Sequence, residues 1–171
     1  RVHGRHDLPW QHPRSAYRVW ISEIMLQQTQ VRTVIPYFNA FMASFPRLCD
    51  LANAPADRVM QAWAGLGYYS RARNLHASAK RCMELHNGSL PEDFEALLAL
   101  PGIGRSTAGA ILSQAHGARH AVLDGNVKRV LSRVFTPQGK AGSSALDNRL
   151  WQLAESLLPA DNLANYTQAL M

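Results

Sequence analysis

Two acidic residues far apart in the sequence, Glu23 and Asp124, stand in settings that suit different roles in acid–base chemistry. Glu23 has Val19 and Leu26 four and three residues away on a predicted helix, and apolar surroundings raise the pKa of a carboxyl group. A carboxyl that holds its proton near neutral pH suits a general acid. The structural alternative is an exposed glutamate at the edge of an amphipathic helix.

Asp124 lies in the segment LDGNVKRV, where a helix is predicted to begin. As an N-cap, its carboxylate would accept a hydrogen bond from the amide of Asn126 or Val127 and would stay ionised. Capping alone is the default interpretation of a single aspartate. The functional interpretation is a fixed anion near a sugar, which stabilises positive charge developing at the anomeric carbon.

The stretch LPGIGRSTA, residues 100–108, places a tight turn between two predicted helices. Gly102 and Gly104 can take positive φ and let a phosphate approach the backbone. The amides of Gly104, Arg105 and Ser106 then lie at a helix N-terminus, which favours an anion. Such a contact positions nucleic acid without reading its sequence. The alternative is an ordinary helix–turn–helix corner that needs glycine to close.

Two further segments suit contact with bases. Gln27, Gln28 and Gln30 supply paired donors and acceptors for base edges, although a solvated polar face is the alternative. In GLGYYSRARNL, Tyr68 is followed by Arg71, and an aromatic wedge flanked by cations can enter a base step. The alternative here is a tyrosine pair in the core with arginines on the surface.

The elements that must position these residues are predicted to be helices. Apolar spacing, prolines, glycines and N-capping residues indicate helices over residues 17–30, 34–45, 55–64, 69–86, 91–98, 106–116, 124–135 and 143–158, with a last one from residue 161. Residues 121–123 are too short to count as a strand. The fold class is therefore all-α.

Composition favours a polyanionic partner. The chain has 171 residues, of which 47% are hydrophobic, and carries a net charge of +6. Lys128 and Arg129 oppose the dipole of the helix that they begin, so we expect them to bind phosphates. Cys49 and Cys82 form no CxxC pair, which fits a reducing compartment. No apolar run is long enough to span a membrane, and we expect residues to be missing at both ends of the chain.

Six motifs in order, LPWQ, SEIMLQQTQV, VIPYF, GLGYYSRARNLH, LPGIGRSTAGAIL and LDGNVKRVL, resemble the MutY family of bacterial adenine DNA glycosylases, in the helix–hairpin–helix superfamily. The resemblance covers essentially the whole chain. It implies base excision repair of double-stranded DNA, in which adenine mispaired with 8-oxoguanine or guanine is removed by hydrolysis of the N-glycosidic bond of a flipped nucleotide. A monomer in the bacterial cytoplasm is expected. The alternative is a non-catalytic helix–hairpin–helix DNA-binding module.

The resemblance also implies roles for single residues. Glu23 is the acid that protonates adenine and assists attack by water, Asp124 stabilises the oxocarbenium-like state, and Asn126 supports the pair. The expected substrate and DNA contacts are Trp10 in the adenine pocket, Gln27 and Gln28 near the opened stack, Tyr68 as the wedge, Arg71, Gly102, Gly104, Arg105, Ser106, Lys128, and Gln168 on the flipped base.

One position distinguishes the reaction. Related endonuclease III proteins carry a nucleophilic lysine where this chain has Ser106, and serine cannot form a Schiff base. They also lack the glutamate at position 23. Base removal without true lyase chemistry is therefore expected. His116 is expected to pack or cap a helix, not to carry protons.

The family implies a six-helix barrel over residues 9–119 and a second lobe, truncated here, from residues 1–8 and 120–171. DNA would bind between them, with Glu23 on one side and Asp124 on the other. The family's [4Fe–4S] cluster is held by cysteines further along the chain, which Cys49 and Cys82 do not match. The hairpin carbonyls of Leu98, Leu100 and Ile103 would hold a monovalent cation.

Overall fold

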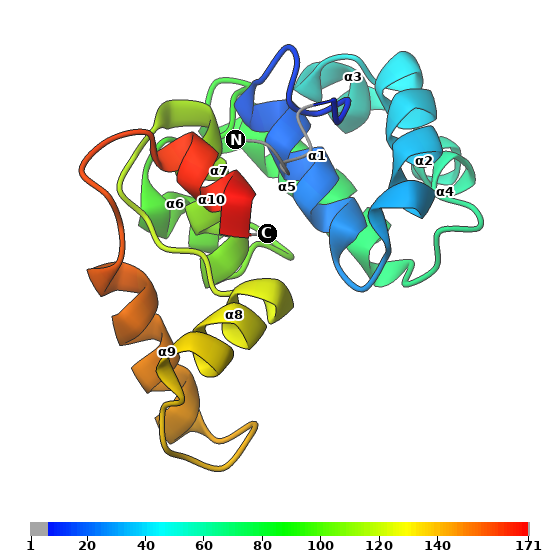
Figure 1. Cartoon of the computed structure of the whole chain (residues 1–171). Helices are drawn as coiled ribbons and strands as arrows, with labels where there is room; N and C mark the ends of the chain where they lie inside the picture. The colour runs from blue at the N-terminus through cyan, green and yellow to red at the C-terminus, as the bar shows by residue number, and fades with distance from the viewer. Residues whose placement is uncertain (1–6, 171) are drawn as a thin grey trace. The chain divides into compact units, whose positions relative to one another are not determined.

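The computed structural model describes residues 7–170, and every regular element in that range is an α-helix, as the sequence predicts (Figure 1). The chain divides into two compact units, and the boundary along the sequence falls between Gly104 and Arg105. The predicted barrel of residues 9–119 would also include the helix after Arg105, and that boundary stays a prediction. The first unit holds α1 (Ala16–Leu26), α2 (Val31–Ser44), α3 (Leu48–Asn53), α4 (Ala56–Ala62), α5 (Ser70–Leu85) and α6 (Phe94–Leu98); the second holds α7 (Arg105–His116), α8 (Gly125–Phe135), α9 (Ser144–Ser156) and α10 (Leu163–Leu170).

Helix α1 is shorter than predicted. It begins after Ser15, whose hydroxyl accepts a hydrogen bond from the amide of Arg18 at 3.3 Å. It ends at Leu26, because Gln28 takes a left-handed conformation with φ +58° that no α-helix can continue. The expected helix over residues 17–30 is therefore wrong at its end, and the glutamines lie on a turn.

Helix α2 starts before its predicted first residue. The helix begins at Val31, so Pro36 lies in its interior instead of its first turn. A proline there removes one hydrogen bond to the preceding turn. Pro36 is exposed, so water can satisfy the carbonyl that loses its donor. The apolar residues Val34, Phe38 and Phe41 are fully buried beneath it.

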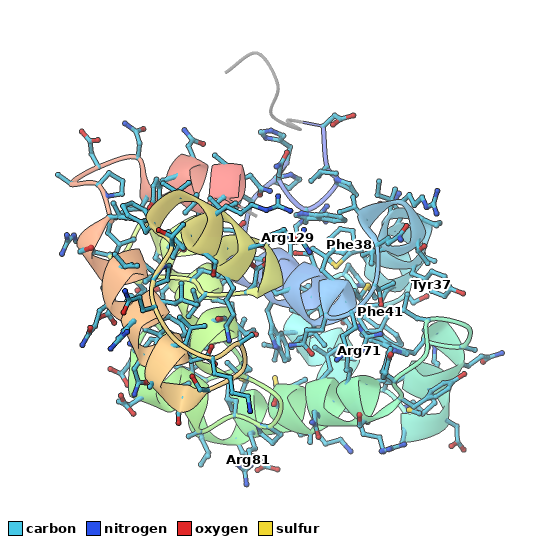
Figure 2. All side chains as sticks on the ribbon, turned by 60° about the horizontal axis from the view of Figure 1, so that its bottom comes forward. Tyr37, Phe38, Phe41, Arg71, Arg81 and Arg129 are labelled. Carbon is cyan, nitrogen blue, oxygen red and sulfur yellow. The ribbon has the colours of Figure 1, made fainter. Side chains whose placement is uncertain are left out.

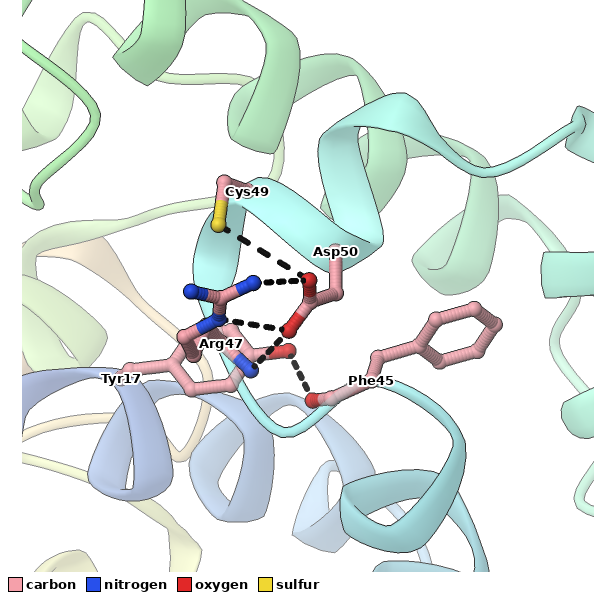
Figure 3. Close-up of polar contacts among 5 residues, drawn as sticks. All are labelled: Tyr17, Phe45, Arg47, Cys49 and Asp50. Carbon is pink, nitrogen blue, oxygen red and sulfur yellow. Dashed lines mark hydrogen bonds and ion pairs between the residues drawn. The ribbon is translucent and has the colours of Figure 1, made fainter.

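The short helix α3 was not predicted. Its start is fixed by Asp50, whose carboxylate accepts hydrogen bonds from the amide of Arg47 at 3.0 Å and from the Arg47 guanidinium at 2.8 and 3.0 Å (Figure 3). These bonds hold the pKa of the Asp50 carboxyl below its usual value. The hydroxyl of Tyr17 donates to the carbonyl of Phe45 at 2.8 Å and joins α1 to the end of α2.

Aromatic side chains fill the core of the first unit. Trp20, Phe38, Phe41, Phe45 and Trp63 are each no more than 1% exposed. Phe41 meets Phe45 and Trp63 edge to face, with ring centroids 4.9 and 6.0 Å apart. Around this core, α1 and α4 pack on α5, and α2 packs on α4. Burial of these large rings stabilises the first unit.

In the second unit, α8 packs on α9 and α10 packs on α7. The core consists of six buried residues: Ala121, Leu123, Val127, Leu131, Leu150 and Ala154. Helix α7 ends at Gly117, which has φ +66° and lets the amide of Ala118 donate to the carbonyl of Leu112 at 3.1 Å. The hydroxyl of Thr167 donates to that of Ser113 at 3.2 Å and joins α10 to α7.

No helix of residues 7–170 combines the length and the apolar character that crossing a bilayer requires.

Helix α5 carries a buried histidine, His76, which is 6% exposed and whose Nε2 has no hydrogen-bond partner among residues 7–170. Burial, and secondarily the charge of Lys80, lower the pKa of its imidazole below the ordinary 6.5. The unfolded chain therefore binds a proton at a pH where the folded chain does not. The unfolding free energy should fall as pH drops below 6.5 toward the lowered pKa.

We predict that chemical denaturation measured between pH 7.5 and 5 shows this loss, with a slope of at most about 1.4 kcal/mol per pH unit from this one proton. In His76→Gln the slope should shrink in that window. An unchanged slope in the variant would mean that other groups cause the acid sensitivity.

Candidate functional site

Glu23 lies on α1, one turn before the helix ends, with a half-buried side chain. Its neighbours in the chain, Ser22 and Ile24, are buried. The setting agrees with the partly apolar surroundings expected from its helical spacing. Glu23 belongs to the first unit, whereas Asp124 and Asn126 belong to the second.

Asp124 caps α8 as predicted. Its carboxylate accepts a hydrogen bond from the amide of Val127 at 2.8 Å, and its backbone is extended, with φ −83° and ψ −177°. The carboxylate is half-buried, and Asn126 lies exposed in the first turn of α8. The hydrogen bond from Val127 therefore fixes the position of this carboxylate at the N-terminus of α8.

The segment that leads to Asp124 is held against α7. The hydroxyl oxygen of Ser106 accepts a hydrogen bond from the amide of Leu123 at 3.1 Å. A Cβ on Gly109 would lie only 2.3 Å from the carbonyl oxygen of Ala121, so only glycine permits this close approach. Ser106 therefore positions the residue before Asp124, while its own O–H can still donate.

The hairpin between α6 and α7 is held by α5. Gly102 has φ +78°, and a Cβ there would lie 2.9 Å from the Cβ of Asn74. The hydroxyl of Ser78 donates to the carbonyl of Pro101 at 2.8 Å, and the guanidinium of Arg81 donates to the carbonyl of Ala99 at 3.0 Å. The conformation of this turn is thus imposed by three polar residues of one helix.

Gly104 does not take the positive φ that its place in the motif suggests. Its φ lies outside the left-handed region, and a Cβ there would meet nothing within 4 Å. The glycine leaves open backbone just before α7, which begins at Arg105. This is consistent with close approach of a phosphate to the first amides of α7.

The Arg105 side chain has its partners within the second unit, and the expected contact of the Arg105 backbone amide with a phosphate stays a prediction. Its guanidinium pairs with Glu155 and lies 3.8 Å from the ring centroid of Trp151, so it anchors α7 to α9. Only the backbone amide of Arg105 remains a candidate for anion binding.

Lys128 requires a correction. Its amine donates to both carboxylate oxygens of Asp147, at 2.7 and 2.8 Å, and links α8 to α9. The pair is about two-fifths exposed, so it is a solvated ion pair of small net value. Arg129, labelled in Figure 2, is exposed and stays a candidate for phosphate contact.

The three expected base contacts outside the helices are accessible. Gln27 and Gln28 are exposed after the end of α1, and Tyr68 is 59% exposed just before α5. Tyr68 also takes a left-handed conformation, with φ +48°. The interpretation of Tyr68 as a core residue is therefore wrong, and its ring can reach a partner.

The Arg71 side chain faces the interior of the first unit. Its side chain is 8% exposed, and its terminal nitrogens donate to carbonyls at the end of α1 and in the loop before α5. Burial lowers the pKa of the guanidinium, which still stays charged. The expectation that Arg71 flanks the wedge as a phosphate-binding cation is wrong, because the group faces inward.

Trp10 is buried, whereas Gln168 is half-buried. Trp10 is 3% exposed and meets Phe38 edge to face at 5.4 Å, so its ring packs in the core instead of lining an open pocket. The side-chain oxygen of Gln168 is buried and has no donor among residues 7–170. A buried acceptor without a donor is costly unless a ligand supplies one.

His116 is the last residue of α7, and its side chain is exposed. Its neighbour Gly117 ends the helix, so the expected place of His116 at a helix terminus is confirmed.

The described residues do not fit an iron–sulfur cluster. Within residues 7–170 no three His, Cys, Asp or Glu side chains gather, and Cys82 is fully buried, which raises the pKa of its thiol to about 11. A cluster needs thiolates, so we derive no step through one. The carbonyls expected to hold a monovalent cation lie at the last residue of α6 and in the turn after it, where that of Leu100 already accepts the Ile103 amide at 3.2 Å.

Comparison with known proteins follows the same motifs. Residues 21–156 match the family model described as "HhH-GPD superfamily base excision DNA repair protein". The chain is 45% identical over 98% of its length to an adenine DNA glycosylase of Buchnera aphidicola from Acyrthosiphon pisum, and 46% identical over 98% to that of Homo sapiens. It covers 48% of the first relative and 32% of the second, so it spans at most about half their length.

Solved structures confirm the expected fold. The chain superposes on a thermostable thymine-DNA glycosylase with a TM-score of 0.86 and 28% identity, covering 99% of this chain and 78% of that one. A non-covalent endonuclease III–DNA complex gives a TM-score of 0.81 at 21% identity, with 99% and 77% covered. The all-α helix–hairpin–helix DNA glycosylase fold is therefore correct.

The two hairpin glycines offer a matched pair of variants. We predict that Gly102→Ala lowers the unfolding free energy by about 1–3 kcal/mol, because alanine is strained at φ +78° and its Cβ collides with Asn74. Gly104→Ala should leave stability within about 0.5 kcal/mol but weaken DNA binding, because the added methyl group obstructs a phosphate. Thermal unfolding and DNA titration separate the two effects; equal stability losses would contradict the assignment.

Proposed function

This chain belongs to the HhH-GPD superfamily of base excision DNA repair proteins, and we propose that it is the catalytic part of a monofunctional adenine DNA glycosylase. The observation that carries the proposal is the identity of about 45%, spread over nearly the whole chain, to proteins named adenine DNA glycosylase. The finer proposal is that adenine is removed from mispairs with 8-oxoguanine or guanine in double-stranded DNA. The protein would act in the bacterial cytoplasm.

The proposed reaction divides the work between two carboxyl groups. Glu23 donates its proton to the departing adenine as the bond from the base nitrogen to the anomeric carbon breaks. Asp124 stays ionised and stabilises the positive charge that develops on the sugar. Water then adds to that carbon and loses a proton to Glu23. Asn126, one residue from the N-terminus of α8, supports the carboxylates through its amide.

Ser106 supports hydrolysis without strand cleavage. A lyase step needs an amine that forms a Schiff base with the opened sugar, and Ser106 has none. The amine of Lys128 is held by Asp147, so it is not poised as a substitute. The product of the proposed reaction is therefore an intact strand with an abasic site.

The proposed DNA contacts are of two kinds. The hairpin at Gly102 and Gly104, with the first amides of α7, would hold a phosphate and fix the position of the duplex. Gln27, Gln28 and Tyr68 would enter the stack opened by the flipped nucleotide. Gln168, with its buried oxygen, would accept a donor from the extruded base.

Glu23→Gln provides the first test. The amide cannot donate a carboxylic proton, so adenine release should fall by about 10²–10⁴-fold while DNA binding is kept. The assay uses the full-length protein in excess over a duplex with adenine opposite 8-oxoguanine and scores alkali-labile sites. Tight binding by the wild type without any release would favour a binding module instead.

Asp124 allows capping and catalysis to be separated. Asparagine caps helices as well as aspartate does, so Asp124→Asn should keep stability within about 0.5 kcal/mol, whereas Asp124→Ala should lose about 1 kcal/mol. Both should reduce single-turnover adenine release by about 10²–10³-fold, because both remove the charge. Full activity in Asp124→Asn would reduce this residue to a structural cap.

A further inference from the structure

Two exposed residues of the first unit hold strained backbone. Gln28 and Tyr68 are not glycines, yet both have positive φ, +58° and +48°. The left-handed conformation costs a side chain of this kind about 1–3 kcal/mol, and it persists only where surrounding contacts impose it. They lie in different loops, one after α1 and the other before α5.

One guanidinium binds the carbonyl just before each strained residue. Arg71 Nη1 donates to the carbonyl of Gln27 at 2.6 Å, and Nη2 donates to that of Gly67 at 3.3 Å. The remaining bonds fix the two loops on either side, at the carbonyls of Ile24, Met25 and Leu66 and the hydroxyl of Thr29, with distances between 2.8 and 3.4 Å.

The Tyr68 ring itself also depends on Arg71. The guanidinium carbon lies 5.4 Å from the ring centroid of Tyr68 and 5.4 Å from that of Trp63. Trp63 is fully buried, and its indole N–H donates to the carbonyl of Gly67 at 3.1 Å. The exposed ring therefore rests on a charged group that is anchored in the core. Figure 2 labels Arg71, which lies on α5.

We propose that Arg71 is a positioning residue that holds Gln28 and Tyr68 as one preformed element, ready to enter the base stack beside an extruded nucleotide. The proposal rests on the proposed function only in taking a duplex with an adenine mispair as the DNA that is bound. Preforming matters because ordering two loops upon binding would use up binding free energy. All six hydrogen-bond acceptors of Arg71 are neutral, so none of them cancels its positive charge. That charge also favours binding of a polyanion to the two loops.

Lysine is the most informative replacement for Arg71. It keeps the positive charge and most of the length, but its compact ammonium has three donors and cannot reach acceptors in both loops as the planar guanidinium does. Arg71→Lys should therefore release the loops without removing the charge. Arg58→Lys is a matched control, because Arg58 also lies over an aromatic ring, that of Phe45 at 5.7 Å, but is exposed and contacts neither loop.

The experiment uses the full-length protein and two duplexes, one with a 2-aminopurine·8-oxoguanine mispair and one fully paired. Fluorescence of 2-aminopurine reports unstacking, and titration gives both dissociation constants. In Arg71→Lys we expect the fluorescence rise to be lost and the preference for the mispair to fall by about tenfold, as release of one strained residue would give. The affinity of Arg71→Lys for the paired duplex should stay within about twofold of the wild-type value. Arg58→Lys should stay within about twofold of the wild type in both dissociation constants and in the fluorescence rise.

Three results would overturn the proposal: an Arg71→Lys protein with the fluorescence rise of the wild type, equal losses on both duplexes, or a wild type that gives no rise. If Arg71→Lys does not fold, Thr29→Val removes one acceptor of the guanidinium and should give a smaller loss in the same direction; no loss would overturn the proposal. Neither readout requires adenine release, so failure of the proposed reaction is recognised separately in the wild type.

Discussion

The first unit depends on one constraint: the carbonyls that a helix leaves without partners at its C-terminal end must find donors when that end is packed inside the protein. Helix α5 supplies them. Arg71 donates to carbonyls at the end of α1, and Arg81 donates to the carbonyl that follows α6. Two helices therefore end where a polar side chain of α5 meets them.

The segments proposed to contact DNA are the continuations of these helix ends. The glutamines follow α1, and Tyr68 precedes α5 itself. The hairpin follows α6 and is tied to α5 through Ser78. Because one rigid helix holds all three segments, their spacing is set by the fold of the first unit alone. A bound duplex would then meet a surface that needs little rearrangement.

Features governed by local chemistry could be predicted from the sequence. Asp124 caps α8 and Ser143 caps α9, because a capping side chain needs only the amides of the next turn. The glycine ends of α5 and α7 were predictable for the same reason, since Gly88 and Gly117 take positive φ. The all-α class followed from the apolar spacing.

Features decided by distant partners could not be predicted. Lys128 was interpreted as a phosphate-binding cation, yet it pairs with Asp147, and nothing near Arg105 in the sequence indicates its ion pair with Glu155. Arg71 read as a surface cation because nothing near it in the sequence shows that the end of α1 needs a donor.

One pattern in the sequence of α5 indicates the contacts that this helix makes. Asn74, Ser78 and Arg81 are polar residues spaced by four and three on the predicted helix, so they share one face. Only Ser78 of the three is buried, and polar side chains that share such a face can serve backbone groups of another segment.

Amide hydrogen exchange tests the central claim most directly, because it reports the opening of each segment separately. The amides of Thr29 and Leu66 are bonded within the two loops, at 3.2 and 3.1 Å, and that of Phe45 lies at the end of α2, at 2.8 Å. If Arg71 holds the loops, Arg71→Lys should speed exchange at Thr29 and Leu66 by at least about tenfold more than at Phe45. A uniform increase at all three amides, or none, would contradict the account.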